Sequence, residues 1–148
     1  MTGAALKNPS QLPGRLGLGG AASLLLVDAP AVLAELLSSS RPQGSDTVLS
    51  DSLGLPAVKR HFPAILLWRE DRVGSQSVLG SVVRRLDAEA VLWIVTAKKK
   101  VVGPRTRAVH RLGLADLIRE LEPRGLAYDR EVAISSWHVA YRFVKRQT

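Results

Sequence analysis

The residues best suited to chemistry form a cluster of positive charge near position 100. Segment 98–111 contains Lys98, Lys99, Lys100, Arg105, Arg107, His110 and Arg111. It follows the apolar run Val91–Thr96, and the basic residues end just inside an apolar-periodic stretch that we expect to be a helix. Because the free N–H groups at a helix start attract anions, the segment predicts a site for phosphate, nucleic acid or an acidic protein surface. A solvated loop face without a ligand is the alternative.

The charge of the whole chain favours the same interpretation. Its formal net charge is +8, and residues 1–68 contribute only +1 of this because they hold five basic and four acidic side chains. The remaining +7 lies in residues 69–148. Such asymmetry is typical of polyanion binding, since neutralised phosphates release counterions. Free use of arginine, which supplies 15 of the 21 basic residues, is the alternative explanation.

Two further residues could contact a ligand. Trp137, between two expected strands, could stack on a base, although packing over the hairpin is the favoured role. Asp28 follows an apolar run, at the position where open α/β sheets bind ligands, and could mark a cofactor cleft. Its favoured role is to cap the helix that follows. His138 would need a neighbouring carboxylate to act as a base, and the sequence pattern supplies none.

No catalytic or metal-binding set is recognisable. The chain has no cysteine, which excludes thiol catalysis and cysteine-based metal sites, and its three histidines lack the short spacing of a metal site. No Ser/His/Asp order, paired-carboxylate motif or P-loop is present. We therefore assign no catalytic residue and no metal ligand.

A glycine-rich stretch, Gly14–Gly20, lies on the wrong side of the first expected strand to hold a cofactor. A phosphate-cradling glycine turn must follow a strand and open a helix. The residues in that position here are Asp28, Ala29 and Pro30, and proline has no N–H to donate. We interpret the glycines as a turn that leads into the strand.

The elements that must position these residues alternate between strands and helices. Continuous apolar runs predict strands buried on both faces, as in a parallel sheet, at Ser23–Val27, Ala64–Trp68 and Val91–Thr96, with a short edge strand at Thr47–Leu49. Helical periodicity predicts helices after Pro30, at Ser77–Leu86 and at Val109–Glu122. Alternation in Tyr128–Ser135 and Val139–Lys145 predicts a hairpin. We predict a three-layer, Rossmann-like α/β fold, with a mostly parallel sheet that ends in an antiparallel β-hairpin.

The chain is expected to form one domain over residues 21–148, preceded by a flexible leader over residues 1–20. Its longest apolar runs are far shorter than the roughly 20 residues of a membrane helix, and no signal-peptide core is recognisable. We expect a cytoplasmic protein with no membrane partner. The oligomeric state is left open.

The order of elements resembles the class I methyltransferase fold, whose last strand is antiparallel to the others. A more detailed pattern is formed by Leu16-Gly17-Leu18, Asp28-Ala29-Pro30, Trp93, Lys98, the helix Val109–Glu122, Gly125-Leu126, Trp137 and Phe143-Val144-Lys145. In these residues the chain resembles a family of small bacterial proteins of unknown function. Ala97 departs from the family pattern, which has proline before the lysine. The resemblance implies a methyltransferase-like fold and no established activity.

The favoured hypothesis is a non-catalytic, methyltransferase-like binding module that contacts nucleic acid or another polyanion through segment 98–111 and needs no cofactor. A divergent methyltransferase that uses S-adenosylmethionine near Asp28 is the first alternative, and the missing glycine turn disfavours it. A protein–protein scaffold or homodimer that uses apolar surface of the N-terminal half is the second.

Overall fold

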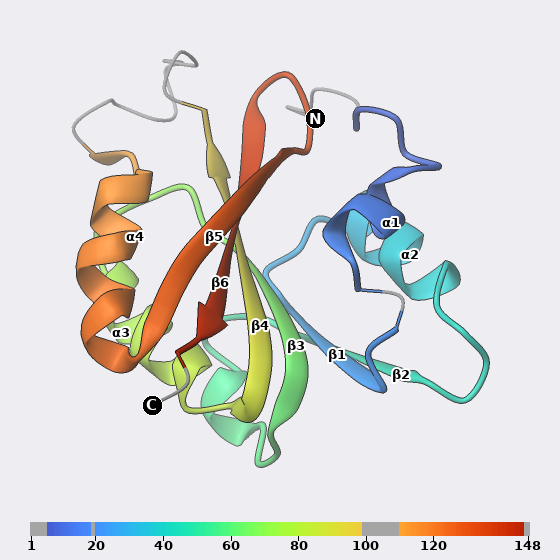
Figure 1. Cartoon of the computed structure of the whole chain (residues 1–148), viewed down its shortest axis with the longest axis horizontal. Helices are drawn as coiled ribbons and strands as arrows, with labels where there is room; N and C mark the ends of the chain where they lie inside the picture. The colour runs from blue at the N-terminus through green and yellow to red at the C-terminus, as the bar shows by residue number, and fades with distance from the viewer. Residues whose placement is uncertain (1–5, 19, 99–109, 147–148) are drawn as a thin grey trace.

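A computed structural model describes residues 6–18, 20–98 and 110–146 of the chain. Within these residues one mixed sheet of six strands has helices on both of its faces (Figure 1). The strands are β1 (Ser23–Val27), β2 (Asp46–Ser50), β3 (Phe62–Trp68), β4 (Leu86–Ala97), β5 (Leu126–Ala133) and β6 (His138–Lys145). The helices are α1 (Leu12–Leu16), α2 (Ala31–Ser39), α3 (Ser75–Val83) and α4 (Leu114–Leu121), with 3-10 turns at Leu55–Ala57 and Glu122–Arg124.

The strand order is β2-β1-β3-β4-β6-β5. Strands β2, β1, β3 and β4 are parallel, and β6 lies antiparallel between β4 and β5. Helices α3 and α4 cover one face of this sheet, and α1 and α2 cover the other (Figure 1). The predicted three-layer α/β fold with a terminal hairpin is confirmed.

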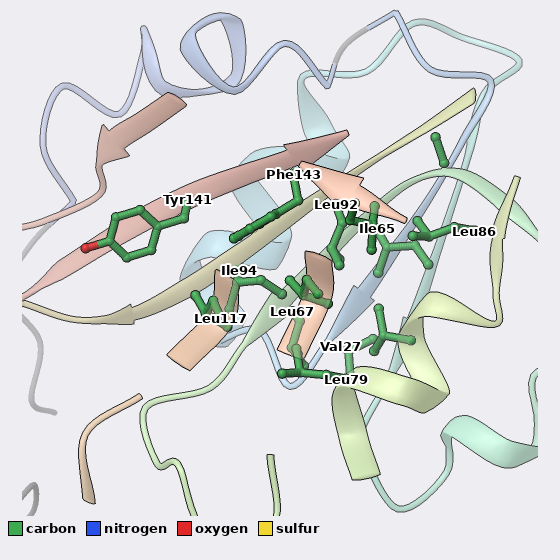
Figure 2. Packing of buried hydrophobic residues seen from close by; sticks show 14 of the residues in the cluster. Val27, Ile65, Leu67, Leu79, Leu86, Leu92, Ile94, Leu117, Tyr141 and Phe143 are labelled. Atoms are coloured by element: carbon green, nitrogen blue, oxygen red, sulfur yellow. The ribbon is translucent and has the colours of Figure 1, made fainter. Parts of the chain in front are cut away.

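One core lies between the sheet and helices α3 and α4. The register aligns Leu25, Ile65, Leu92 and Phe143 across four neighbouring strands, and all four side chains are fully buried. Figure 2 shows part of this cluster, where strand residues meet Leu79 of α3 and Leu117 of α4. Helices on both faces explain why β1 consists entirely of buried residues and shows no polar alternation.

A second core on the opposite face includes the N-terminal segment. Leu12, Leu16 and Leu18 are at most 3% exposed and pack in one cluster with Trp93. The indole Nε1 of Trp93 donates a hydrogen bond of 3.0 Å to the Leu16 carbonyl. Residues 6–18 therefore belong to the domain, and the flexible leader expected over residues 1–20 is wrong for them. A helix of five residues is too short to show the periodicity that would have predicted it.

Two helix boundaries also differ from the prediction. The helix expected over Ser77–Leu86 ends at Val83, because Leu86 begins β4 and pairs with Phe62. An apolar residue at that position satisfies the helical pattern and the strand pattern equally well. The helix expected from Val109 begins at Leu114, where the side chain of Asp116 accepts the N–H of Gly113 at 2.9 Å.

Among the described residues, every helix is too short or too polar to span a bilayer.

Changing Trp93→Phe tests the link between the N-terminal segment and the sheet. The aromatic ring remains, but the buried Leu16 carbonyl loses its indole donor, so we expect the free energy of unfolding to fall by about 1–3 kcal/mol. Denaturant unfolding measures this loss. Trp137→Phe is the matched control, because Trp137 is 42% exposed, and it should stay within about 0.5 kcal/mol of the parent protein. Equal effects of the two changes would contradict the role given to this hydrogen bond.

Candidate nucleic-acid interface

The ends of three strands meet at one edge of the sheet, namely the edge at which the parallel strands β3 and β4 terminate. Strands β3 and β4 end here and β6 begins here, with Ala97 of β4 opposite His138 of β6. Just beyond this pair, the backbone N–H of Lys98 donates to the Trp137 carbonyl at 2.8 Å. Segment 98–111, the basic segment, therefore begins directly beside the turn of the β5–β6 hairpin.

The structure describes part of the predicted anion site. Lys98, His110 and Arg111 are described, whereas Lys99, Lys100, Arg105 and Arg107 lie outside the described residues. Lys98 is half-buried and His110 is exposed. The backbone is anchored to this edge at both Lys98 and His110, since the Lys98 N–H donates to the Trp137 carbonyl and the Arg72 N–H donates to the His110 carbonyl at 2.7 Å.

Lys98 has a second cation beside it that the sequence analysis did not single out. Burial lowers the pKa of Lys98, and the neighbouring Lys7 ammonium lowers it further, while the negative charge of Glu131 opposes both effects. Lys7 is held there because its backbone N–H donates to the Ile134 carbonyl at 2.8 Å. Two like charges in proximity cost free energy, and a bound anion would relieve that cost.

Trp137 is an exposed aromatic surface on a well-defined turn. Its side chain is 42% exposed, and its backbone N–H donates to the Ser135 hydroxyl at 3.1 Å. The structure thus places Trp137, whose side chain is accessible, next to Lys98 through a backbone contact. Aromatic faces beside cations are the combination used by proteins that bind single-stranded nucleic acid.

We expected His110 and Arg111 to lie just inside an α-helix, but both precede helix α4. Helix α4 begins at Leu114, and Asp116 in its first turn occupies the helix start. Burial raises the pKa of Asp116, but the Gly113 N–H and the Arg119 guanidinium outweigh it and keep the pKa lowered. The chain therefore supplies a carboxylate of its own at this helix start, and binding of an external anion there stays a prediction.

Arg111 is directed into the fold. Its Nε donates to the Ala97 carbonyl at 2.7 Å, and its backbone forms a β-bridge with Asp71. These contacts join the segment before α4 to the end of β4. Of the described candidates, Arg111 therefore serves mainly to anchor the edge, whereas Lys98 faces solvent in part.

His138 has the carboxylate partner that the sequence pattern did not reveal. Its Nε2 lies 2.9 Å from Oε2 of Glu70, and its Nδ1 lies 3.2 Å from the Ser135 hydroxyl. The ring also packs on Trp68, with centroids 4.5 Å apart. Glu70 stands 68 positions before His138, so no local motif could have indicated the pair.

The hydrogen bonds of this group indicate a structural role. The Ser135 oxygen accepts the backbone N–H groups of Trp137 and His138, each at 3.1 Å. Its own proton is then donated to Nδ1, which leaves a proton on Nε2 for Glu70. Both ring nitrogens are engaged and Ser135 is 1% exposed, so the group fixes the hairpin against the end of β3 and offers no accessible nucleophile.

Asp28 connects the loop after β1 to the loop after β2 through hydrogen bonds. Its backbone N–H donates to the Ser50 carbonyl at 2.9 Å, and its carboxylate accepts the N–H of Ser52 at 3.1 Å. Helix α2 begins after Pro30 without a side-chain cap, so the helix-cap role expected for Asp28 is wrong. The residue adopts a left-handed φ of 58°, which turns its carboxylate toward the loop after β2.

The described residues at this edge contain no group of three histidine or acidic side chains that could hold a metal ion. The donors best suited to a ligand are instead the ammonium groups of Lys7 and Lys98 and the indole of Trp137. This set fits an anion with an attached ring better than it fits a metal.

Comparison with known proteins finds similarity in structure alone. No family model and no curated protein sequence matches the chain. A methyltransferase from Aquifex aeolicus that depends on S-adenosylmethionine superposes with a TM-score of 0.72 at 16% identity, over 94% of this chain and 90% of that one. The chain has a methyltransferase-like fold.

Two further solved structures agree. Magnesium protoporphyrin IX methyltransferase (ChlM) from Synechocystis PCC 6803, with bound S-adenosylhomocysteine, has a TM-score of 0.65 at 12% identity, over 93% of this chain and 80% of that one. The N-methyltransferase NodS from Bradyrhizobium japonicum WM9 has a TM-score of 0.65 at 14% identity, over 93% of this chain and 94% of that one. The expected resemblance to the methyltransferase fold is confirmed.

Changing Glu70→Ala tests whether the contact with His138 holds the edge together. We expect the free energy of unfolding to fall by about 1–2 kcal/mol, because the variant lacks a partly exposed hydrogen bond to a charged group. Thermal and denaturant unfolding provide the measurement. Glu35→Ala removes an exposed glutamate from α2 and should change stability by less than about 0.5 kcal/mol. If the two variants were equally stable, the Glu70–His138 pair would have no structural role.

Proposed function

We propose that the chain is a non-catalytic, methyltransferase-like module that binds single-stranded nucleic acid at the edge described above. The basic edge, as we define it, comprises Lys7, Lys98 and Trp137 together with the basic residues of segment 99–109. The observation that carries the proposal is the Lys98–Trp137 backbone hydrogen bond of 2.8 Å. It brings Trp137, whose side chain is exposed, to the start of a run of three lysines.

Each part of the basic edge has a physical role in this proposal. The ammonium groups contact phosphates, which releases counterions and makes binding depend on salt. The Trp137 indole stacks on a base, and such stacking contributes about 1–3 kcal/mol for each base with little dependence on its identity. The proposed module therefore binds with weak sequence preference. The absence of cysteine suits a reducing compartment, and we place the protein in the cytoplasm.

Lysine substitutions test the electrostatic part of the proposal. Changing Lys98, Lys99 and Lys100 together to alanine should weaken binding to mixed-sequence single-stranded DNA and RNA by at least tenfold at low salt. A plot of the logarithm of the association constant against the logarithm of the salt concentration should also become less steep. Its slope should change by about 0.7 for each phosphate that the variant no longer neutralises. Fluorescence anisotropy over a salt series measures both quantities.

Single substitutions provide the control for this triple variant. Lys98→Ala should weaken binding, whereas Lys59→Ala, which removes an exposed lysine before β3, should leave the affinity unchanged. Polyglutamate as a competitor separates nucleic acid from an acidic protein surface as the ligand. No binding at low salt, or equal displacement by polyglutamate, would contradict the proposal.

Substitution of Trp137 tests the stacking part. Trp137→Ala should reduce affinity for single strands by about 1–3 kcal/mol, whereas Trp137→Phe should keep most of it, since any aromatic face can stack on a base. Affinity for a duplex of the same sequence should change little, because its bases are already stacked. A tryptophan fluorescence titration with single strands gives an independent readout. Identical affinities for the alanine and phenylalanine variants would exclude stacking.

The second candidate function is that of a divergent methyltransferase. It is favoured by the fold that this chain shares with the methyltransferases compared above. One of those methyltransferases carries bound S-adenosylhomocysteine. The residues after β1 do not favour a cofactor turn in this chain, because they include no glycine, Pro30 lacks an N–H, and the Asp28 carboxylate already accepts the Ser52 N–H. Calorimetric titration with S-adenosylmethionine and S-adenosylhomocysteine decides between the two. Saturable heat would support the enzyme, and silence at millimolar ligand would exclude it.

A further inference from the structure

Strand β2 leaves one edge of the sheet open. Among the strands that the structure describes, it is a terminal one and pairs with β1 alone (Figure 1). The Asp46 N–H donates to the Ala22 carbonyl, and the Ser50 carbonyl accepts the Asp28 N–H, so the backbone groups of these β2 residues point toward β1. Because these directions alternate along a strand, Thr47 and Leu49 direct their N–H and C=O groups outward.

The terminal strand at the other side of the sheet, β5, is protected against pairing with another chain, whereas β2 is not. Strand β5 exposes Asp129, Arg130 and Glu131 in succession, and its register shifts between Tyr128 and Arg130. Charges and irregularities of this kind prevent an edge strand from pairing with another chain. Strand β2 has the sequence DTVLS, which contains no lysine, proline or irregularity, and its Leu49 is 63% exposed.

The charge around β2 is suited to pairing with a second copy of itself. At its amino end, Asp46 lies between two arginines, because Arg60 forms an ion pair with its carboxylate at 2.9 Å and Arg41 donates to its carbonyl at 3.3 Å. The end where β2 stops has two carboxylates, Asp28 and Asp51, and Asp51 is exposed. One end is therefore net positive and the other net negative. Antiparallel pairing of two copies places opposite charges together, whereas parallel pairing places like charges together.

We propose that β2 pairs antiparallel with β2 of a second copy, around a two-fold axis at Val48, and that the protein is a dimer with one continuous sheet. Thr47 then lies opposite Leu49 of the second copy, and each such pair exchanges both of its N–H···O=C hydrogen bonds. Leu49 is exposed and lies beside Leu26 on the side toward β1, and in the dimer Thr47 of the second copy would lie against its open side. The self-complementary contact is isologous, as a closed dimer requires.

A matched pair of leucine substitutions tests the proposed dimer. Leu49→Lys places a charge on the pairing edge and should convert the dimer to a monomer. Leu53→Lys makes the same chemical change at a side chain that is 92% exposed just beyond β2, and this variant should remain dimeric. Analytical ultracentrifugation of the full chain across a concentration series measures the masses. A monomeric parent protein, or the same mass for both variants, would overturn the proposal.

Hydrogen exchange on the parent protein tests the same contact without any substitution. The amides of Thr47 and Leu49 should exchange slowly at high protein concentration and faster after dilution, because they are paired only in the dimer. A dimer in which these two amides exchange freely would be formed by another surface and would contradict the proposal. A monomer whose amides become protected only when an extended peptide is added would show that the edge takes a different partner, and would overturn it as well.

Discussion

Strand β4 is buried on both faces over its second half, and this constraint organises the rest of the molecule. Leu92 and Ile94 face the core under α3 and α4, while Trp93 and Val95 face the core that includes α1 and α2. A strand in this environment needs covering layers on both sides and paired neighbours at both of its edges. The Trp93 indole adds a polar requirement, because its N–H must find an acceptor in a dry interior. The carbonyl of Leu16 meets that requirement and draws the N-terminal segment into the domain.

The candidate interface is a consequence of the same strand. Because β6 is antiparallel to β4, the hairpin turn that contains Trp137 reaches the edge where β4 ends, and Lys98 pairs with it. The N-terminal segment also reaches this edge, since Leu6 forms a bridge with Ser135 and brings Lys7 toward Lys98. Three parts of the chain that are far apart in sequence thus supply the cations and the aromatic ring.

The pattern of apolar residues was sufficient to predict most of the strands. The run Ser23–Val27 is β1 without any change of boundary, and the short run Thr47–Leu49 is the edge strand β2. Helix ends are predicted less accurately than strands. The start of α4 depends on the hydrogen bond between Gly113 and Asp116, and the end of α3 depends on whether Leu86 continues the helix or begins a strand. Both choices are made by neighbours that the local pattern does not contain.

The sequence by itself determined the class of fold, the concentration of charge in the second half of the chain and the lack of a glycine turn after the first strand. These properties depend on composition and on short periodic patterns. The tertiary structure alone decided the contacts between distant residues. It placed Glu70 on His138, directed the Asp28 carboxylate to Ser52 in place of a helix cap, and set Lys7 beside Lys98. Such contacts arise because parallel strands end at a common edge, and the order of strands in a sheet is set by packing over the whole domain.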